Sequence, residues 1–522
     1  MNLISEPWIP IRRADGRVET IAPWQLTDGI GENPILAVSS PRPDFDGALT
    51  QFLIGLLQTT YTPSEDQWWD RRDAAPAPEV LRERFEVVAH AFDLEGDRAF
   101  LQDFNPEQLD KKFGIVALLV GSPPENSDTD LFVKEDAVKQ LCRRCVAAAI
   151  FALQTGAPEG GRGYRTGLRG GGPLTTLVLG DNLWDTCWLN VLEKSRYLAG
   201  ASSEDPAAPE RFPWLAPTRT SEAKPPAGVT TPLDVHPDQQ YWTIPRRIRL
   251  VAEACEPVAC DICGVEHQLV YRTFLTKNYG VNYDGFEHPL SPHYTRDSSL
   301  LPVHPRPGGI GYRHWLGLVE SSADGSQRPA RVVDQFRTFT RKDGDLWAFG
   351  FDMKSNKARC WYDARMPILS APVGMEDVFR DLASRMVKAA EKAADDLRNS
   401  LKAALAGKAK VRGDLGFVQR DFWEITEVSF YVHLRQLRAR LPDDPCAFPV
   451  LESWLQALRA AALDLFDRHS QTGDFDAVEP RRIALARKGL GKALAGAPLK
   501  GKILGLPNPT RAKSKTGSRR RP

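Results

Sequence analysis

Hydrophobic and polar positions follow two different patterns along this chain. In the N-terminal part, the segment WIPIRRADGRVETI (8–21) predicts two short strands joined at Asp15 and Gly16, a favoured hairpin turn. The segment DGALTQFLIGLLQTTY (46–61) carries apolar residues at helical spacing, and WTIPRRIRLV (242–251) is typical of a strand. This mixture predicts a large mixed α and β domain over residues 1–370.

After about Pro372 the spacing becomes helical throughout. Apolar residues recur every three or four positions from Phe379 to Ala404. Three further amphipathic segments follow, at 420–437, 450–469 and 481–494. Helices of this kind with short connections pack as a bundle, so we expect a four-helix bundle over residues 371–495. The predicted fold class is therefore α+β, a large mixed N-terminal domain followed by a C-terminal four-helix bundle.

Composition indicates the class of protein. The chain of 522 residues is too long for one ordinary core, and its 42% hydrophobic and 26% charged residues are globular values. Its longest apolar stretches are too short to span a bilayer, and the N-terminus has no basic start followed by an apolar run. We therefore expect a cytoplasmic protein that makes no contact with a membrane.

Charge is balanced overall but uneven locally. The 68 basic and 67 acidic residues leave a net charge of +1, so only local patches could bind a nucleic acid. Residues 140–180 contain five arginines and one acidic residue, and residues 498–522 contain eight basic residues and no acidic one. We expect residues 496–522 to be a basic, disordered tail, which either solubilises the protein or contacts nucleic acid.

Three of the five arginines in the first patch, Arg162, Arg165 and Arg169, lie in a glycine-rich loop, GAPEGGRGYRTGLRGGGP (156–173). Glycine lets a bulky ligand approach the backbone, and the planar fork of arginine suits phosphate. The loop lacks the ending of a P-loop and does not match a dinucleotide fingerprint, so we expect a polyanion surface and not a mononucleotide site. The alternative interpretation is a glycine-rich bend close to the core.

Two C-x-x-C pairs are the clearest candidate metal ligands. Cys142 with Cys145 and Cys260 with Cys263 could supply four thiolates, the donor set of a structural zinc site. A redox-active pair and free buried thiols are the alternatives. Four sulfur ligands leave no open position for water, so a zinc ion here would be structural.

Motifs of catalysis are scarce in the sequence. We find no H-E-x-x-H pair, no nucleophile elbow and no paired-carboxylate motif. This favours a binding protein over an enzyme. The alternative function is a zinc-containing enzyme that acts on nucleotides or nucleic acid through the Gly/Arg-rich loop.

Several motifs together resemble one known family. NLISEPWIPI, LCRRC, TGLRGGGPLTT, CDIC, FEHPLSP, VVDQFR and IALAR occur in the order found in CasA, the large subunit of the type I-E CRISPR complex Cascade. The resemblance runs from the first residues to about Ala495. It implies a non-catalytic subunit of an RNA-guided surveillance complex in antiviral defence. Such a subunit recognises the protospacer-adjacent motif in double-stranded DNA, helps to start strand separation and R-loop formation, and recruits the helicase–nuclease.

The resemblance also implies partners and site residues. The partners are the other Cascade subunits, the guide CRISPR RNA, target double-stranded DNA and the helicase–nuclease. A structural zinc ion falls on the four cysteines named above. Motif contacts in the minor groove fall on a glycine loop and, beside it, a lysine: Gly160, Gly161, Arg162, Gly163 and Lys277.

Two further segments receive roles from the same resemblance. A glutamine-tipped hairpin that wedges the strands apart falls on Val333, Asp334 and Gln335, where a plain strand and turn is the alternative. A loop near the guide RNA and the motif falls on Phe132 and Val133. Glu159 and Arg162 stand where the family has glycine, so the motif recognised could differ.

Overall fold

The computed structural model describes residues 1–122, 132–134, 136–198, 209–354, 357–405, 415–470 and 479–507. The chain divides into two compact units. The larger unit comprises Met1–Ile310 and Trp315–Ser370, and the second comprises Gly311–His314 and the chain from Ala371 onward. Within the described residues, no helix combines the length and the apolar character that crossing a membrane requires.

The larger unit holds small sheets of three strands each. Their strands, in spatial order, are β2 (Val18–Ile21), β1 (Ile9–Arg13) and β3 (Ile35–Val38); β4 (Lys111–Gly114), β7 (Glu266–Lys277) and β6 (Arg247–Ala259); β12 (Lys357–Ile368), β11 (Gly344–Lys354) and β5 (Thr175–Leu179); and β10 (Gln327–Arg328), β8 (His293–Arg296) and β9 (Ser299–Pro302). All the pairings are antiparallel. The strands expected at 8–21 are confirmed as β1 and β2, with Gly16 at a φ of +86° in the turn between them.

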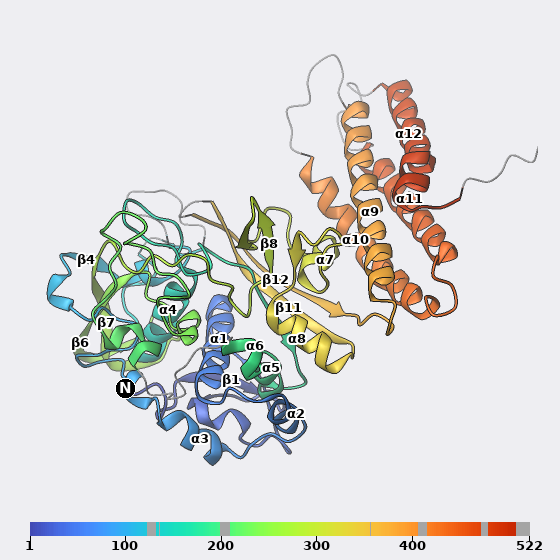
Figure 1. Ribbon diagram of the computed structural model, residues 1–522. Coiled ribbons are helices and arrows are strands. Elements are labelled where there is room, and N and C mark those ends of the chain that lie inside the picture. The colour runs from blue at the N-terminus through green and yellow to red at the C-terminus, as the bar shows by residue number, and fades with distance from the viewer. Residues whose placement is uncertain are drawn as a thin grey trace, which may run out of the picture. The chain divides into compact units, whose positions relative to one another are not determined.

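Helix α1 (Pro43–Thr60) runs through the middle of the larger unit (Figure 1) and is buried along nearly all of its length. Its central ring, Phe52, meets Trp8, Phe151 and Trp242 edge to face at 5.2–5.6 Å. Such pairs of rings stabilise a core beyond their buried area. The other helices of this unit are α2 (Glu65–Asp73), α3 (Pro78–Glu86), α4 (Arg143–Gly156), α5 (Leu183–Leu189), α6 (Lys194–Leu198), α7 (Trp315–Leu318) and α8 (Arg331–Thr340).

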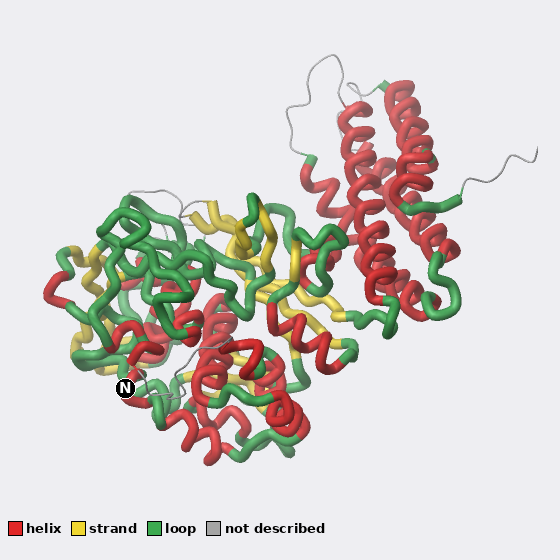
Figure 2. Tube along the Cα trace, in the orientation of Figure 1, coloured by secondary structure: helices red, strands yellow, loops and turns green. Residues whose placement is uncertain are grey.

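The second unit is built almost entirely of helices, whereas loops and turns make up much of the larger unit (Figure 2). Its long helices are α9 (Glu376–Leu405), α10 (Gly416–Arg440), α11 (Phe448–Ser470) and α12 (Pro480–Ala495). Helix α9 packs against each of the other three. The helical segments expected from the apolar spacing after Pro372 are therefore confirmed, and so is the mixture of helix and sheet before it.

Two expectations about local structure are wrong. Residues 331–340 form helix α8 and neither a hairpin nor a strand, because Val332, Val333 and Phe336 lie on one helical face and are buried. The tail does not begin at residue 496. After α12 the chain makes one more helical turn at Pro498–Ile503, and Leu499, Leu504 and Leu506 are buried. Residues 508–522 lie outside the described part of the chain.

Candidate nucleic-acid interface and cysteine cluster

The glycine-rich loop leaves helix α4 and returns to its end. The amide of Gly167 donates to the carbonyl of Ala157 at 3.1 Å, which closes the base of a loop over residues 157–167. The tip, from Glu159 to Arg162, is exposed to solvent. The tip of the loop is therefore an exposed finger, in which Gly160, Gly161 and Arg162 are accessible to a partner. The following part of the loop packs against the protein, with Gly167, Arg169, Gly172 and Pro173 buried.

The end of strand β7 braces this finger. The side-chain amide of Asn278 donates to the carbonyl of Arg162 at 2.6 Å, and the amide of Tyr279 donates to the carbonyl of Gly163 at 2.7 Å. Gly163 has a φ of +80°, a conformation that suits glycine. Lys277, the last residue of β7, is half-buried beside this contact. The structure thus brings together the glycine loop and the segment of Lys277, which are far apart in sequence.

The three arginines of the loop have different surroundings. Arg162 is exposed, but Arg165 donates from Nε to Ser221 Oγ at 2.7 Å and from Nη2 to the Ser221 carbonyl at 3.0 Å. Arg169 is buried and donates to Gln51, Thr175 and Ser291. Burial lowers the pKa of Arg169 to about 9. Of the three arginines, only Arg162 is therefore exposed at the tip, since the other two anchor the loop to the protein.

Two cations that the sequence analysis did not single out flank Tyr164 of the loop. The Lys111 ammonium lies 5.8 Å from the centroid of the Tyr164 ring, and Cζ of Arg246 lies 4.8 Å from it. Lys111 is exposed on strand β4, which is an edge strand of its sheet, and its Nζ donates to Asn278 Oδ1 at 3.2 Å. We call Lys111, Tyr164 and Arg246 the basic cluster. In the sequence, only the pair Lys111–Lys112 and the position of Tyr164 within the Gly/Arg-rich loop pointed to this cluster.

The basic cluster is tied to helix α4. Gln154, which is buried near the end of α4, donates to the carbonyl of Arg246 at 2.8 Å and accepts from its amide at 3.0 Å. Nη2 of Arg246 in turn donates to the carbonyl of Pro158 in the loop. One end of α4 therefore fixes the backbone of Arg246, whose side chain holds the loop.

The other end of α4 carries the cysteine cluster. Cys142 is the N-cap of α4 and Cys145 lies in its first turn, whereas Cys260 and Cys263 lie in the turn between β6 and β7. The four sulfur atoms all lie within 4.8 Å of one another, and Cys142 Sγ is 3.8 Å from Cys263 Sγ. A tetrahedral site with metal–sulfur bonds of about 2.3 Å has sulfur–sulfur edges of about 3.8 Å. The four cysteines are free thiols that fit a metal ion.

Contacts among the four thiols shift the pKa values of Cys260 and Cys263 downward. Hydrogen bonds from Cys142 and Cys145 hold the pKa of Cys260 well below its usual range. A hydrogen bond from Cys145 lowers the pKa of Cys263 to about 6. A lowered pKa favours the thiolate, which is the form of cysteine that binds a metal.

Backbone contacts hold the two cysteine pairs together. The carboxylate of Asp261 accepts the amides of Lys139 and Gln140 at 2.7 and 2.8 Å. Leu141 and Tyr271 exchange two backbone hydrogen bonds directly beside Cys142. The segment before α4 is therefore fastened to the β6–β7 turn next to the sulfurs.

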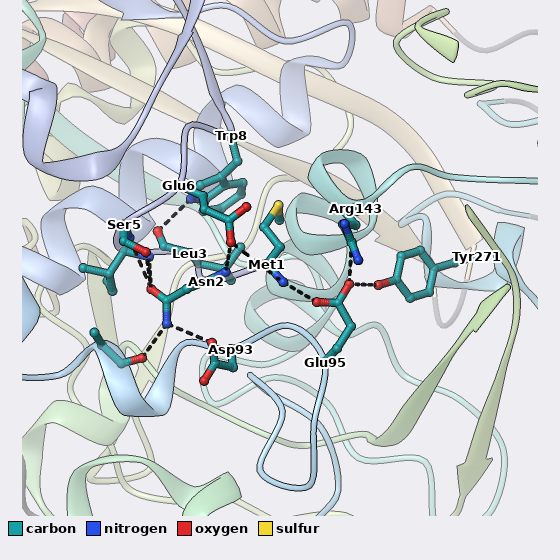
Figure 3. Close-up of polar contacts among 12 residues, drawn as sticks. Met1, Asn2, Leu3, Ser5, Glu6, Trp8, Asp93, Glu95, Arg143 and Tyr271 are labelled. Atoms are coloured by element: carbon teal, nitrogen blue, oxygen red, sulfur yellow. Dashed lines mark hydrogen bonds and ion pairs between the residues drawn. The ribbon is translucent and has the colours of Figure 1, made fainter. Parts of the chain in front are cut away.

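Glu95 joins the N-terminus to the same region (Figure 3). Its carboxylate accepts hydrogen bonds from the N-terminal ammonium of Met1 at 2.5 Å, from Arg143 Nε at 2.8 Å and from the Tyr271 hydroxyl at 2.6 Å. Burial opposes ionisation of Glu95, but these three donors outweigh it and hold the pKa of Glu95 below its usual value. Since Arg143 lies between Cys142 and Cys145, this network also orients the start of α4.

The segment expected to separate DNA strands has a different setting. Val333 and Gln335 are buried on helix α8. Nε2 of Gln335 donates to the carbonyl of Val191, and its Oε1 accepts from the amide of Glu193, both at 2.9 Å. Asp334 is exposed and pairs with Arg196 at 3.3 Å. In this conformation Val333 and Gln335 cannot touch DNA, and a wedging role would first require α8 to leave its place.

Phe132 and Val133 differ in exposure. Phe132 is 36% exposed, and its ring meets that of Phe351 of β11 edge to face at 5.7 Å. Val133 is buried. Of the two residues expected near guide RNA, only Phe132 presents part of its side chain to solvent; residues 123–131 of that loop lie outside the described part of the chain.

Comparisons with known proteins agree on one family. A family model described as CRISPR-associated protein Cse1 matches residues 2–465. The chain is similar in structure to CasA from Thermus thermophilus, with a TM-score of 0.68 and 18% sequence identity over 95% of this chain and 99% of that one. It is also similar to Thermobifida fusca Cse1, with a TM-score of 0.69 and 17% identity over 97% and 98% of the two chains. A chain from a structure described as a CRISPR RNA-guided surveillance complex matches with a TM-score of 0.68 and 17% identity over 95% of this chain and 99% of that chain.

Proposed function

Because the chain belongs to the Cse1 family, the CasA large subunits of type I-E CRISPR systems, we propose that it recognises the protospacer-adjacent motif in duplex DNA. The exposed tip of the glycine loop, from Glu159 to Arg162, makes this contact. The minor groove is narrow, and a tip whose two central residues are glycine brings its backbone close to the groove without bulky side chains at that point. Lys277, beside the brace of the loop, extends the contact along the groove.

The observation that carries this proposal is the combination of exposure and rigidity in one loop. Gly160, Gly161 and Arg162 are open to solvent, while hydrogen bonds from Asn278 and Tyr279 hold the residues directly below them. A loop that is fixed at its base and exposed at its tip loses little conformational freedom when it docks. That property suits the recognition of a short motif that must be sampled many times.

The cysteine cluster has a structural role in this function. Zinc is the metal that a set of four thiolates suits best, and the four ligands leave no position for a reacting water. Zinc supplies a cross-link between the start of α4 and the β6–β7 turn. The chain's own residues then carry that constraint along α4 to Gln154, Arg246 and the loop. The role of this subunit is accordingly binding, without catalysis.

The partners follow from the family. One of the similar chains comes from a CRISPR RNA-guided surveillance complex, which supports assembly of this chain with the other Cascade subunits and a guide CRISPR RNA. Phe132 contacts the guide RNA close to the motif. Once the motif is bound, the subunit helps to open the duplex, starts the R-loop and recruits the helicase–nuclease. This places the protein in antiviral defence.

The test is reconstitution of the complex with and without this chain. Duplexes that carry the target, with and without a library of flanking motifs, are offered to both complexes. We expect the complete complex to select particular motifs and the incomplete complex to bind all of them equally weakly. Equal motif selection by both complexes would contradict the proposed function. Co-purification of the chain with guide RNA and other subunits checks the assembly separately.

A further inference from the structure

The guanidinium of Arg246 carries a buried N–H group without an acceptor. Its Nη2 donates to the carbonyl of Pro158, but among the described residues no acceptor lies within hydrogen-bonding distance of the buried Nη1. Burial lowers the pKa of Arg246 to about 10. No described carboxylate pairs with this half-buried guanidinium, so its positive charge meets only the Pro158 carbonyl and the Tyr164 ring. In such partly desolvated surroundings a charge acts over a longer range than in water.

This charge lies directly behind the tip of the glycine loop. A Cβ atom placed on Gly160 would come within 3.5 Å of Arg246 Nη1. Gly160 itself is exposed. The guanidinium of the half-buried Arg246 therefore lies close behind Gly160, next to the Tyr164 side chain.

Lys111 adds an exposed charge to the same place. It contacts the same ring, Tyr164, and the same brace, Asn278. Lys112, the next residue of strand β4, is also exposed, but successive side chains of a strand point to opposite faces. Lys111 is thus the lysine of this strand that faces the loop.

We propose that the basic cluster binds one backbone phosphate of duplex DNA. Lys111 contacts the phosphate, and Arg246 is a positioning residue that supplies the charge behind Gly160 and holds Tyr164. The inference rests on the proposed function of the loop, because a loop that enters a groove lies next to the phosphates that line it. Contacts to phosphate fix the register of a protein on DNA without selecting sequence, so the cluster would set the position from which the tip tests the motif.

The test measures the dissociation constant of the reconstituted complex between 50 and 200 mM salt, on a duplex with the preferred motif and on one without it. Each phosphate contact that is lost lowers the number of counterions released on binding by about one. The slope of the logarithm of affinity against the logarithm of salt concentration falls accordingly. For Lys111→Ala, the ratio of the dissociation constants at 200 and 50 mM salt should therefore fall by about 3.5-fold. Both duplexes should be affected equally. Lys112→Ala is the matched control, and it should keep the wild-type ratio.

Arg246 needs a test that separates its charge from its support of the loop. Arg246→Gln should weaken binding to both duplexes, and Arg246→Lys, which keeps the charge, should restore most of the affinity. Tryptic cleavage after Arg162 reports whether the loop itself has loosened in either variant. Failure of the lysine variant to restore affinity while the loop stays protected from trypsin would overturn the role of this charge.

Further outcomes separate this inference from the proposed function. If the wild-type complex selects motifs but Lys111→Ala and Lys112→Ala have the same salt dependence, the phosphate-binding cluster is wrong and the proposed function stands. If Lys111→Ala impairs only retention of the guide RNA, the cluster binds RNA and the inference fails. If the wild-type complex does not distinguish duplexes at all, both fail.

Discussion

The backbone of Gly163 passes against the side chain of Asn278 so closely that a Cβ on Gly163 would lie 3.0 Å from Asn278 Cβ. This contact fixes the height of the loop tip above the end of β7. Two residues separated by more than 110 positions in sequence therefore decide where the candidate groove-binding tip is placed.

Replacing Gly163 tests whether that placement matters. Gly163→Ala puts a side chain at a φ of +80°, which costs roughly 1–2 kcal/mol, and pushes the loop away from Asn278. We expect motif-dependent DNA binding to weaken about tenfold, with a loss of folding stability no larger than this strain. Gly156→Ala is the control, because Gly156 lies outside the tip and its added methyl would meet no atom within 4 Å. Equal affinity of the two variants would contradict a fixed tip.

We expect the side chain of Gln335 to contribute to the stability of the folded protein. Gln335→Ala leaves the amide of Glu193 without its acceptor and removes one of two donors to the carbonyl of Val191, which also accepts from Trp68. A buried group left unpaired in this way costs about 1–3 kcal/mol. Thermal denaturation should show the loss. Asp334→Asn removes only an exposed ion pair with Arg196 and should change stability by less than about 1 kcal/mol. A Gln335→Ala variant that is as stable as wild type but fails to open duplex DNA would instead support a wedge.

The cysteine cluster should hold one zinc ion per chain. Metal analysis of the purified protein checks the content, and Cys260→Ser should abolish it because three sulfurs bind zinc far less tightly than four. The variant should also lose protection of the glycine loop from trypsin, since α4 connects the two sites. Cys446→Ser, which changes an exposed cysteine of the second unit, should leave the metal content unchanged. Full metal content in Cys260→Ser would disprove the assignment.

Asp46, in the first turn of α1, predicts a pH dependence of stability. Burial raises the pKa of its carboxyl to about 6, with Asp44 and Asp363 adding to the effect. The folded state therefore disfavours ionisation. The resulting penalty is absent below pH about 4, where the carboxyl is protonated in both states, and is complete above pH about 7. Asp46→Asn keeps the oxygen that accepts the Ser40 amide at 2.6 Å.

We expect Asp46→Asn to stabilise the protein by about 1–2 kcal/mol at pH 7, allowing for partial exposure of the carboxylate, and to have no effect at pH 4. Denaturant unfolding at both pH values measures this difference. Asp44→Asn is the contrasting variant, because it breaks a two-point contact with Arg42 and should destabilise at pH 7. Stabilisation by Asp46→Asn that is independent of pH would contradict the explanation.

The sequence predicted those elements whose cause is local. The turn at Asp15 and Gly16 and the apolar spacing from Phe379 to Ala404 act within a few residues, and both elements are present. Helix α8 was missed because VVDQF can be taken as a strand or as a helix, and only burial against the rest of the unit decides between them. The packed turn at Pro498–Ile503 was not predicted, because the lysines of this segment indicated an exposed tail. The three leucines in and after the turn are nevertheless buried.

The sequence predicted those parts of the candidate site whose residue type has few roles in proteins. The convergence of the two C-x-x-C pairs could be predicted, because four cysteines with this spacing have few roles other than metal binding. Arginine has many uses, so the sequence could not separate the exposed Arg162 from Arg165 and Arg169, which hold the loop in place. Arg246 was beyond prediction, since its importance depends on an N–H group that only the packed structure reveals.

The long separations within the site have a consequence for synthesis of the protein. Cys142 meets Cys260 across 118 positions, and Arg162 meets Asn278 across 116. At ribosomal rates of about 5–20 residues per second, the first cysteine pair and the glycine loop wait roughly 6–24 s for the strands that complete them. During that interval the nascent thiols are open to oxidation and cannot yet form the four-sulfur site, so metal insertion has to follow translation of the β6–β7 turn.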